Sequence, residues 1–162
     1  MAETDDSRQR NVELRKSASD RRKKGDRRKK ADRRKLMTVE KPKELVLLVD
    51  DSPTNLRIGK NFLTKQYTVS TAPSAKKMFE HLENNNPAII LLDIDMPEMD
   101  GYEAIKILKS NPRTKDIPVI FLTSRTEAAD ELKGLCLGAI DYIIKPYDPL
   151  VLLKRIEIRL AG

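Results

Sequence analysis

After Pro42, short runs that are mainly apolar alternate with segments of mixed polarity. Five segments have the length of strands and lie at residues 45–49, 67–71, 88–92, 118–122 and 140–144, and all but the second are mainly apolar. Segments of helical pattern lie between and after them, at residues 53–65, 74–84, 102–110, 127–137 and 149–160. Strands that are apolar throughout and separated by single helices are typical of a parallel sheet covered on both faces. The pattern therefore predicts an α/β domain with a doubly wound, five-stranded parallel sheet.

The first 43 residues lack this pattern. Between Arg15 and Lys35 the only apolar residues are Ala18 and Ala31, so nothing offsets the entropy lost on ordering the backbone. A six-residue repeat beginning Asp-Arg-Arg-Lys starts at positions 20, 26 and 32, and three such copies are too short for a solenoid. We expect residues 1–43 to be a disordered tail and residues 44–162 to form the folded domain.

Charge divides the chain at the same place. Residues 1–43 carry 17 Lys and Arg against 8 Asp and Glu, a net charge of +9, whereas residues 44–162 carry 15 against 17, a net charge of −2. A basic segment of this kind can bind a polyanion such as nucleic acid or acidic lipid head groups. It lacks the interleaved aromatic residues of many single-strand binders, so a solvated tail that confers solubility is the competing interpretation. Both hypotheses remain, and any polyanion binding is expected to be weak.

Polar residues follow several of the predicted strands where the strands end. Asp50 and Asp51 follow the first strand, Asp93 the third, Thr123 the fourth and Lys145 the fifth. The carboxyl ends of parallel strands share one edge of the sheet, where ligands bind in doubly wound folds. Three carboxylates in one cleft repel each other unless a cation lies among them. Oxygen ligands without nearby His or Cys favour Mg²⁺.

With Mg²⁺ present, a phosphoryl group would be tolerated at the same edge. Lys145 would place a positive charge on its oxygens, and Thr123 would supply a hydroxyl donor. Phosphoryl transfer depends mainly on such positioning and electrostatic stabilisation. A carboxylate such as Asp93 can act as the nucleophile and form an aspartyl phosphate.

Four separated motifs resemble those of response regulator receivers, the chemotaxis-receiver-like domains of two-component signalling. They are LLVDDS at 47–52, LLDIDMPEMDG at 91–101, FLTS at 121–124 and GAIDYIIKP at 138–146. The resemblance implies a flavodoxin-like (βα)5 fold. It also implies that Asp93 is the phosphoacceptor and that Thr123 and Lys145 contact the phosphoryl oxygens.

The same resemblance implies the remaining site roles. Asp51 and Asp93 would bind Mg²⁺ directly, Asp50 largely through water, and Asp95 through its backbone carbonyl. Tyr142 would be the aromatic switch residue that turns inward as Thr123 moves.

Two further positions concern how long the signal lasts. In receivers, water approaches the phosphoryl group past the residues two beyond the phosphoacceptor and two beyond the conserved Thr or Ser. These are Asp95 and Arg125 here. An ion pair between them, or Arg125 leaning over the phosphoryl oxygens, would obstruct water and slow hydrolysis, whereas side chains that point into solvent would pair weakly.

Two other classes of protein share part of this inventory. A haloacid-dehalogenase-like phosphatase would use Asp93 as nucleophile in a D-x-D motif, but there the D-x-D strand comes first, whereas here Asp50 and Asp51 precede Asp93. A flavodoxin would cradle a phosphate after the first strand, where two aspartates repel it. We therefore expect a phosphoacceptor switch, with autophosphorylation from small acyl phosphates and slow autodephosphorylation, and no turnover enzyme.

The expected partners follow from the receiver resemblance. No ATP-binding segment of a kinase is present, so a separate sensor histidine kinase is the expected phosphodonor. No output domain follows the last predicted helix within these 162 residues, which leaves either a single-domain regulator or a part of a longer protein, with an unidentified protein target. A phosphorylation-dependent homodimer is expected through the fourth helix, fifth strand and fifth helix, with Asp141 and Arg155 contributing ion pairs.

Location and the single cysteine complete the sequence-based expectations. Without a signal peptide or a long apolar run, the chain is expected to be cytoplasmic. Cys136, the only cysteine, lies between two leucines and is expected to be buried.

Overall fold

A computed structural model of the chain describes residues 40–162. Most of the predicted tail, with its basic repeat, lies outside these residues, so its expected disorder stays a prediction. Residues 40–44 have no regular secondary structure, and Lys43–Gly162 form one compact unit. The predicted division of the chain into a tail and a domain that starts at residue 44 also stays a prediction.

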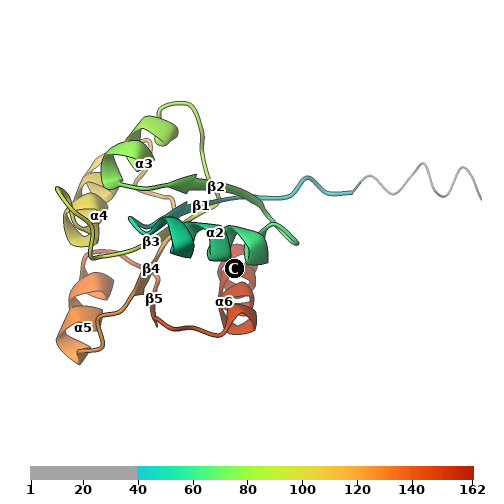
Figure 1. Cartoon of the computed structure of the whole chain (residues 1–162). Helices are drawn as coiled ribbons and strands as arrows, with labels where there is room; N and C mark the ends of the chain where they lie inside the picture. Colours follow the sequence, from blue (N-terminus) through green and yellow to red (C-terminus); the bar gives the residue numbers. More distant parts are fainter. Residues whose placement is uncertain (1–39) are drawn as a thin grey trace, which may run out of the picture. The chain divides into compact units, whose positions relative to one another are not determined.

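The sheet contains the five predicted strands, and all of them run parallel. Their order across the sheet is β2-β1-β3-β4-β5, which reverses between β1 and β3 (Figure 1). In such a doubly wound sheet the ligand site lies at that reversal. The strands are β1 (Leu45–Val49), β2 (Thr68–Ala72), β3 (Ile89–Leu92), β4 (Val119–Thr123) and β5 (Asp141–Ile144).

A helix follows each strand, and most of the helices begin at a capping residue. Ser52, Ser74 and Asp100 each accept a hydrogen bond from a backbone N–H in the first turn of the next helix. Asp100 also forms a capping box with Glu103. The helices are α2 (Pro53–Leu63), α3 (Ala75–Leu82), α4 (Gly101–Ser110), α5 (Ala128–Cys136) and α6 (Pro149–Ala161).

Two apolar cores cover the two faces of the sheet. On β1, Val46 and Leu48 point into one core, while Leu47 and Val49 point into the other. The core around Val46 contains residues of α2 and α6, and the opposite core contains residues of α3 and α4. Figure 1 shows α2 and α6 together on one side of the sheet. Burial on both faces explains why β1, β3 and β4 have no polar alternation, whereas the edge strand β2 is polar and partly exposed at Thr68, Ser70 and Thr71.

The doubly wound five-stranded fold is confirmed, and each predicted element differs from the observed one by at most two residues at either end. None of the helices within residues 40–162 is long and apolar enough to cross a bilayer.

The prediction for Cys136 is wrong, because this side chain is exposed. On α5 only Gly134 is buried. It packs so closely against Phe121 that a Cβ at this position would lie 2.9 Å from the ring. The helix approaches the sheet through this glycine. Its flanking residues Leu132, Leu135 and Cys136 therefore remain at the surface.

Candidate functional site

The parallel strands bring the predicted polar residues together at one edge of the sheet. Beyond the ends of the strands, the backbone ladder continues into the site. The N–H of Asp93 donates to the carbonyl of Val49 at 2.9 Å, and the N–H of Lys145 donates to that of Thr123 at 2.8 Å. Because the backbone of these site residues is part of the sheet, their positions are fixed by the core rather than by mobile loops.

Three carboxylates converge at this edge. Asp50, Asp51 and Asp93 each offer an oxygen within 4.8 Å of the others. Asp50 and Asp93 are buried, whereas Asp51 is exposed. A set of oxygen donors, partly open to water, matches the preference of Mg²⁺ for carboxylates and retained water ligands. The residues present therefore fit the predicted metal.

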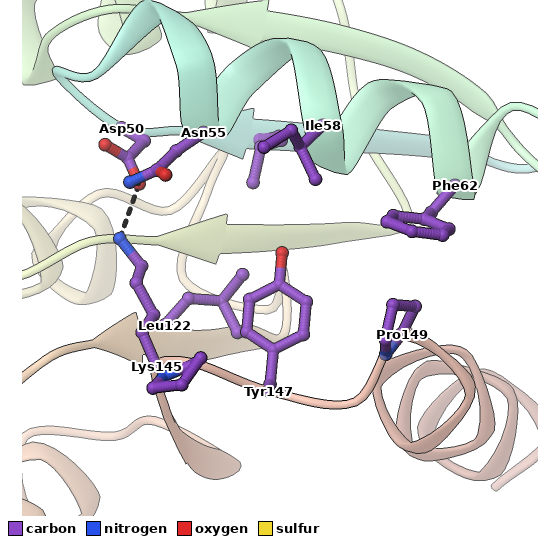
Figure 2. A pocket seen from close by; sticks show the side chains of 10 residues that line it. Asp50, Asn55, Ile58, Phe62, Leu122, Lys145, Tyr147 and Pro149 are labelled. Carbon is purple, nitrogen blue, oxygen red and sulfur yellow. Dashed lines mark hydrogen bonds and ion pairs between the residues drawn. The ribbon is translucent and has the colours of Figure 1, made fainter.

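Lys145 lies between two of the carboxylates. Its Nζ is 2.5 Å from Oδ2 of Asp50 and 3.5 Å from Oδ2 of Asp93, and Figure 2 shows the pair with Asp50 as a dashed line. Burial alone would lower the pKa of Lys145, but the carboxylates of Asp50 and Asp93 outweigh burial and raise it. The lysine is therefore a fixed positive charge, and its nearer partner is Asp50.

Asp93 titrates unusually. Burial, reinforced by the negative charge of Asp50, raises the pKa of Asp93 from 3.8 to about 6, although Lys145 opposes this shift. Its carboxylate is thus in an unfavourable environment when no other cation is present.

Asp50 has two additional donors that sequence reasoning missed. The backbone N–H of Ser52 donates to Oδ1 at 2.9 Å, and Nδ2 of Asn55 donates to Oδ2 at 3.2 Å. Both donors come from the start of α2, so the helix that follows β1 orients the carboxylate. An amide side chain in the first turn after an Asp-Asp pair is the signal that could have indicated Asn55.

Thr123 and Tyr142 are joined through the backbone of Arg125. Thr123 is fully buried, and its Oγ1 accepts a hydrogen bond from the N–H of Arg125 at 3.3 Å. The hydroxyl of Tyr142 donates to the carbonyl of Arg125 at 3.1 Å. The ring of Tyr142 is buried and packs edge to face on Phe121. Tyr142 thus already lies inward, in the orientation that was expected to follow phosphorylation.

Asp95 and Arg125 form the predicted ion pair. Nη2 of Arg125 lies 2.7 Å from Oδ1 of Asp95, and Nε of Arg125 lies 3.0 Å from the same oxygen. The bonds to Asp95 are the main cause that raises the pKa of Arg125 above its ordinary value. Arg125 has a second carboxylate partner, Asp130, and Asp130 also contacts Tyr102. The sequence did not indicate Tyr102 or Asp130. Tyr102 is 28 residues from Asp130 in the chain, and the Arg125 partner of Asp130 lies in a loop.

A cleft of about 340 Å³ opens beside the Asp50–Lys145 pair (Figure 2). One wall is α2 and the other is the loop after β5, from which the ring of Tyr147 points toward α2. The ion pair forms the polar end of the cleft, so the acidic site is accessible from the side of α2. The lining residues are Leu48, Asp50, Asn55, Ile58, Phe62, Leu122, Lys145, Pro146, Tyr147 and Pro149.

Comparison with known proteins agrees with this geometry. The family model described as response regulator receiver domain matches residues 46–157. A probable cyclic di-GMP phosphodiesterase of Vibrio cholerae is 44% identical over 117 residues, which are 72% of this chain and 26% of that protein. The response regulator PleD of Caulobacter vibrioides is 38% identical over 69% of this chain and 25% of its own length. The chain therefore spans about a quarter of the length of these two relatives.

Among solved structures, a response regulator from Chloroflexus aurantiacus, itself described as putative, superposes with a TM-score of 0.71 at 31% identity. The alignment covers 75% of this chain and the whole of that one. These similarities support a phosphoacceptor function and give no support to a haloacid-dehalogenase-like phosphatase. Because the family match extends from the first strand into the last helix of the observed fold, the chain belongs to the response regulator receiver domain family.

Proposed function

We propose that this receiver accepts a phosphoryl group on Asp93 from a phosphohistidine of a separate sensor kinase. The observation that carries the proposal is the environment of Asp93, a buried carboxylate with Asp50 and Asp51 beside it and the Lys145 ammonium 3.5 Å away. Capturing a phosphoryl group requires a positioned nucleophile and compensating positive charge. Asp93 and Lys145 supply these two elements.

In the transfer, an oxygen of Asp93 would form the new bond to phosphorus while the bond from phosphorus to the histidine nitrogen breaks. The electrons of the broken bond return to the imidazole of the kinase. Lys145 would stabilise the charge on the phosphoryl oxygens, and the hydroxyl of Thr123 would donate a hydrogen bond to one of them. Asp50, Asp51, Asp93 and the backbone carbonyl of Asp95 would hold Mg²⁺, which supplies positive charge between the carboxylates and the phosphoryl group when bound.

The signal would leave the site through Thr123. Its hydroxyl now accepts from the Arg125 N–H, so engagement of Thr123 by a phosphoryl oxygen would pull on the backbone of Arg125. Tyr142 bonds the carbonyl of the same residue and would feel the movement. The result would be a population shift at the surface built from α5, β5 and α6.

That surface has the composition of a protein contact. Leu132, Leu135 and Ile144 are exposed there. At the same surface Arg155 bonds Asp141 at 2.8 Å within the domain. A second copy or a downstream target could cover the apolar residues and compete for this exposed pair, which by itself contributes little. Sedimentation with and without beryllofluoride tests the dimer, since an unchanged mass would exclude it.

The phosphoryl group would be protected from water by Arg125 and Asp95. The two side chains form an ion pair at 2.7 Å, which would span the approach on which the family resemblance places the attacking water. Such a receiver would hold its phosphoryl group rather than lose it quickly.

The test of the main proposal is labelling with acetyl phosphate and Mg²⁺, followed by mass spectrometry of peptides. One phosphoryl group is expected on Asp93, and Asp93→Asn or chelation should remove it. Asp116→Asn is a matched control, because Asp116 is exposed and precedes β4 at the opposite edge of the sheet. Stoichiometric labelling of Asp93→Asn would refute the proposal, and repeated turnover of a phosphomonoester would indicate a phosphatase.

A further inference from the structure

Asp130 joins the gate residue Arg125 to two helices. It lies in the first turn of α5, and its Oδ1 is 3.2 Å from Nη1 of Arg125. The hydroxyl of Tyr102, in the first turn of α4, is 3.1 Å from the same oxygen and 3.0 Å from the carbonyl oxygen of Asp130. One carboxylate thus receives donors from α4 and from the loop after β4.

These contacts are less exposed than ordinary surface ion pairs. The side chain of Asp130 is 23% exposed, and Tyr102 is buried. The Tyr102 ring is flanked by two cations, with Nζ of Lys133 4.3 Å and Cζ of Arg125 5.6 Å from its centroid. Charge-assisted bonds that share a partner in a network hold geometry better than isolated exposed pairs.

Arg125 is consequently fixed from both sides. Asp95 binds Nε and Nη2 of Arg125, whereas Asp130 binds Nη1, so the guanidinium is held between two carboxylates. If Asp95 were its only partner, the guanidinium of Arg125 would keep its ion pair at the mouth of the site but could move with the exposed side chain of Asp95. The second carboxylate comes from a helix, which gives the guanidinium an anchor outside the mouth.

We propose that Asp130 is a positioning residue that fixes Arg125 across the mouth of the phosphorylation site and, through Tyr102, couples the lifetime of the phosphoryl group to the packing of α4 and α5. The inference rests on the proposed function, because it concerns the aspartyl phosphate on Asp93. Any event that displaces the start of α5, such as docking of a partner on that helix, changes the rate of hydrolysis. Asp130 itself does not touch the reacting atoms.

The first experiment measures loss of phosphoryl label from Asp93 in the full chain. Asp130→Ala is expected to speed hydrolysis several-fold, and Tyr102→Phe, which removes one donor, is expected to have a smaller effect in the same direction. Asp130→Asn keeps the shape and an acceptor oxygen, so its rate should fall between those of wild type and Asp130→Ala. Glu131→Ala is the control, because Glu131 carries the same charge in the same helical turn but is exposed.

A merely structural role for Asp130 would not produce coupling with Arg125. In a double-mutant cycle, Asp130→Ala should therefore have little further effect on hydrolysis once Arg125 is replaced by Ala. Additive effects of the two substitutions, an effect of Glu131→Ala equal to that of Asp130→Ala, or unchanged or slower hydrolysis in Asp130→Ala would each overturn the inference.

A second measurement needs no phosphorylation. In the unmodified protein, nuclear magnetic resonance of the Arg125 side chain should show slow rotation of the guanidinium, which becomes fast in Asp130→Ala, intermediate in Asp130→Asn and stays slow in Glu131→Ala. Equal rotation rates in all four proteins would overturn the inference even if Asp93 took no label. Absence of label with the expected change in rotation would refute the proposed function while leaving the positioning by Asp130 intact.

Discussion

The ammonium of Lys145 lies 1 Å closer to Asp50 than to Asp93, at 2.5 Å against 3.5 Å. The lysine that is proposed to contact the phosphoryl group is therefore bound mainly to a carboxylate of the candidate metal site. A metal ion held by these carboxylates and Lys145 would compete for the negative charge of Asp50. Phosphorylation would give the lysine a new anionic partner and would leave Asp50 to the metal and to its two neutral donors, the N–H of Ser52 and the amide of Asn55.

Removal of Lys145 should strengthen binding of Mg²⁺ to the unphosphorylated protein. Without the ammonium, Asp50 and Asp93 are uncompensated, so a divalent cation is attracted more strongly. At the effective dielectric of a partly buried site, the gain should be about 1–2 kcal/mol, or roughly 5- to 30-fold in Kd. Calorimetric titration of Lys145→Ala with MgCl2 checks this prediction.

Lys154→Ala is the matched control for Lys145→Ala. Lys154 is exposed on α6 and pairs only loosely with Glu157 at 3.4 Å. Its removal should leave the Kd for Mg²⁺ unchanged. Weaker binding of Mg²⁺ to Lys145→Ala than to wild type would mean that the lysine organises the carboxylates rather than competing with the cation.

The raised pKa of Asp93 predicts how stability depends on pH. With a pKa of about 6 in the folded state and 3.8 as the ordinary value, the folded protein binds this proton more tightly than the unfolded chain does. Stability should therefore fall as the pH rises from about 4 to about 6 and should stay lower above that range. In the absence of Mg²⁺, Asp93→Asn should raise the free energy of unfolding at pH 7.5 by about 1–3 kcal/mol.

Urea unfolding between pH 4 and pH 8 in the presence of a chelator measures this difference. It should be much smaller at pH 4, where Asp93 is protonated in the folded state and partly protonated in the unfolded chain, and it should shrink when Mg²⁺ is added. Asp116→Asn should show no such pattern. An Asp93→Asn variant that is less stable than wild type at pH 7.5 would contradict the expected penalty for burying this carboxylate.

The residues that could be predicted from sequence are those positioned by the backbone. Asp50, Asp93 and Lys145 follow apolar strands directly, so the topology of a parallel sheet brings them to one edge whatever their rotamers are. Asn55 and Asp130 act through side-chain contacts that depend on how α2 and α5 are packed, and sequence spacing does not determine those contacts.

Burial on α5 could not be predicted for the same reason. The apolar neighbours of Cys136 indicate a buried segment, but the close approach of Gly134 to Phe121 turns the apolar side chains of this helix outward. A rule based on hydrophobicity alone does not predict that apolar residues are exposed on a helix that packs through a glycine.

Gly101 should tolerate alanine less well than Gly134. A Cβ at position 101 would lie 2.5 Å from the backbone oxygen of Asp93 and 2.8 Å from Cα of Ile94, neither of which can move without displacing the phosphoacceptor. At position 134 the obstacle is the ring of Phe121 at 2.9 Å. Overpacking of this kind typically costs about 1–3 kcal/mol, and a backbone obstacle should lie at the upper end.

Chemical denaturation of the two alanine variants gives their free energies of unfolding. Gly101→Ala should in addition take up label from acetyl phosphate more slowly, because the clash displaces the Asp93 backbone. Labelling of Gly101→Ala at the wild-type rate, with wild-type stability, would mean that the loop before α4 relaxes to admit a methyl group.

The basic segment makes a prediction about polyanions that depends on charge alone. Residues 1–43 carry a net charge of +9, and if they bind polyanions, retention on heparin or duplex DNA should be lost when residues 1–36 are deleted. If counterion release drives binding, log affinity should fall linearly with log salt concentration. Binding that persists at high salt, or that survives the deletion, would exclude this mechanism.

The ion pair between Arg125 and Asp95 predicts a slow loss of the phosphoryl group. In the proposed gate, water that attacks phosphorus in line with the bond to Asp93 would have to pass the guanidinium, which is held to Asp95 by contacts of 2.7 and 3.0 Å. Arg125→Ala removes the obstruction while leaving the backbone bonds to Thr123 and Tyr142 possible, so label on Asp93 should be lost several-fold faster. Since each ~1.4 kcal/mol of barrier is a factor of ten in rate, even a small steric contribution is measurable. Arg155→Ala removes an exposed arginine from α6 and serves as the control. A phosphoryl group that Arg125→Ala loses no faster than wild type would show that water reaches the site by another route.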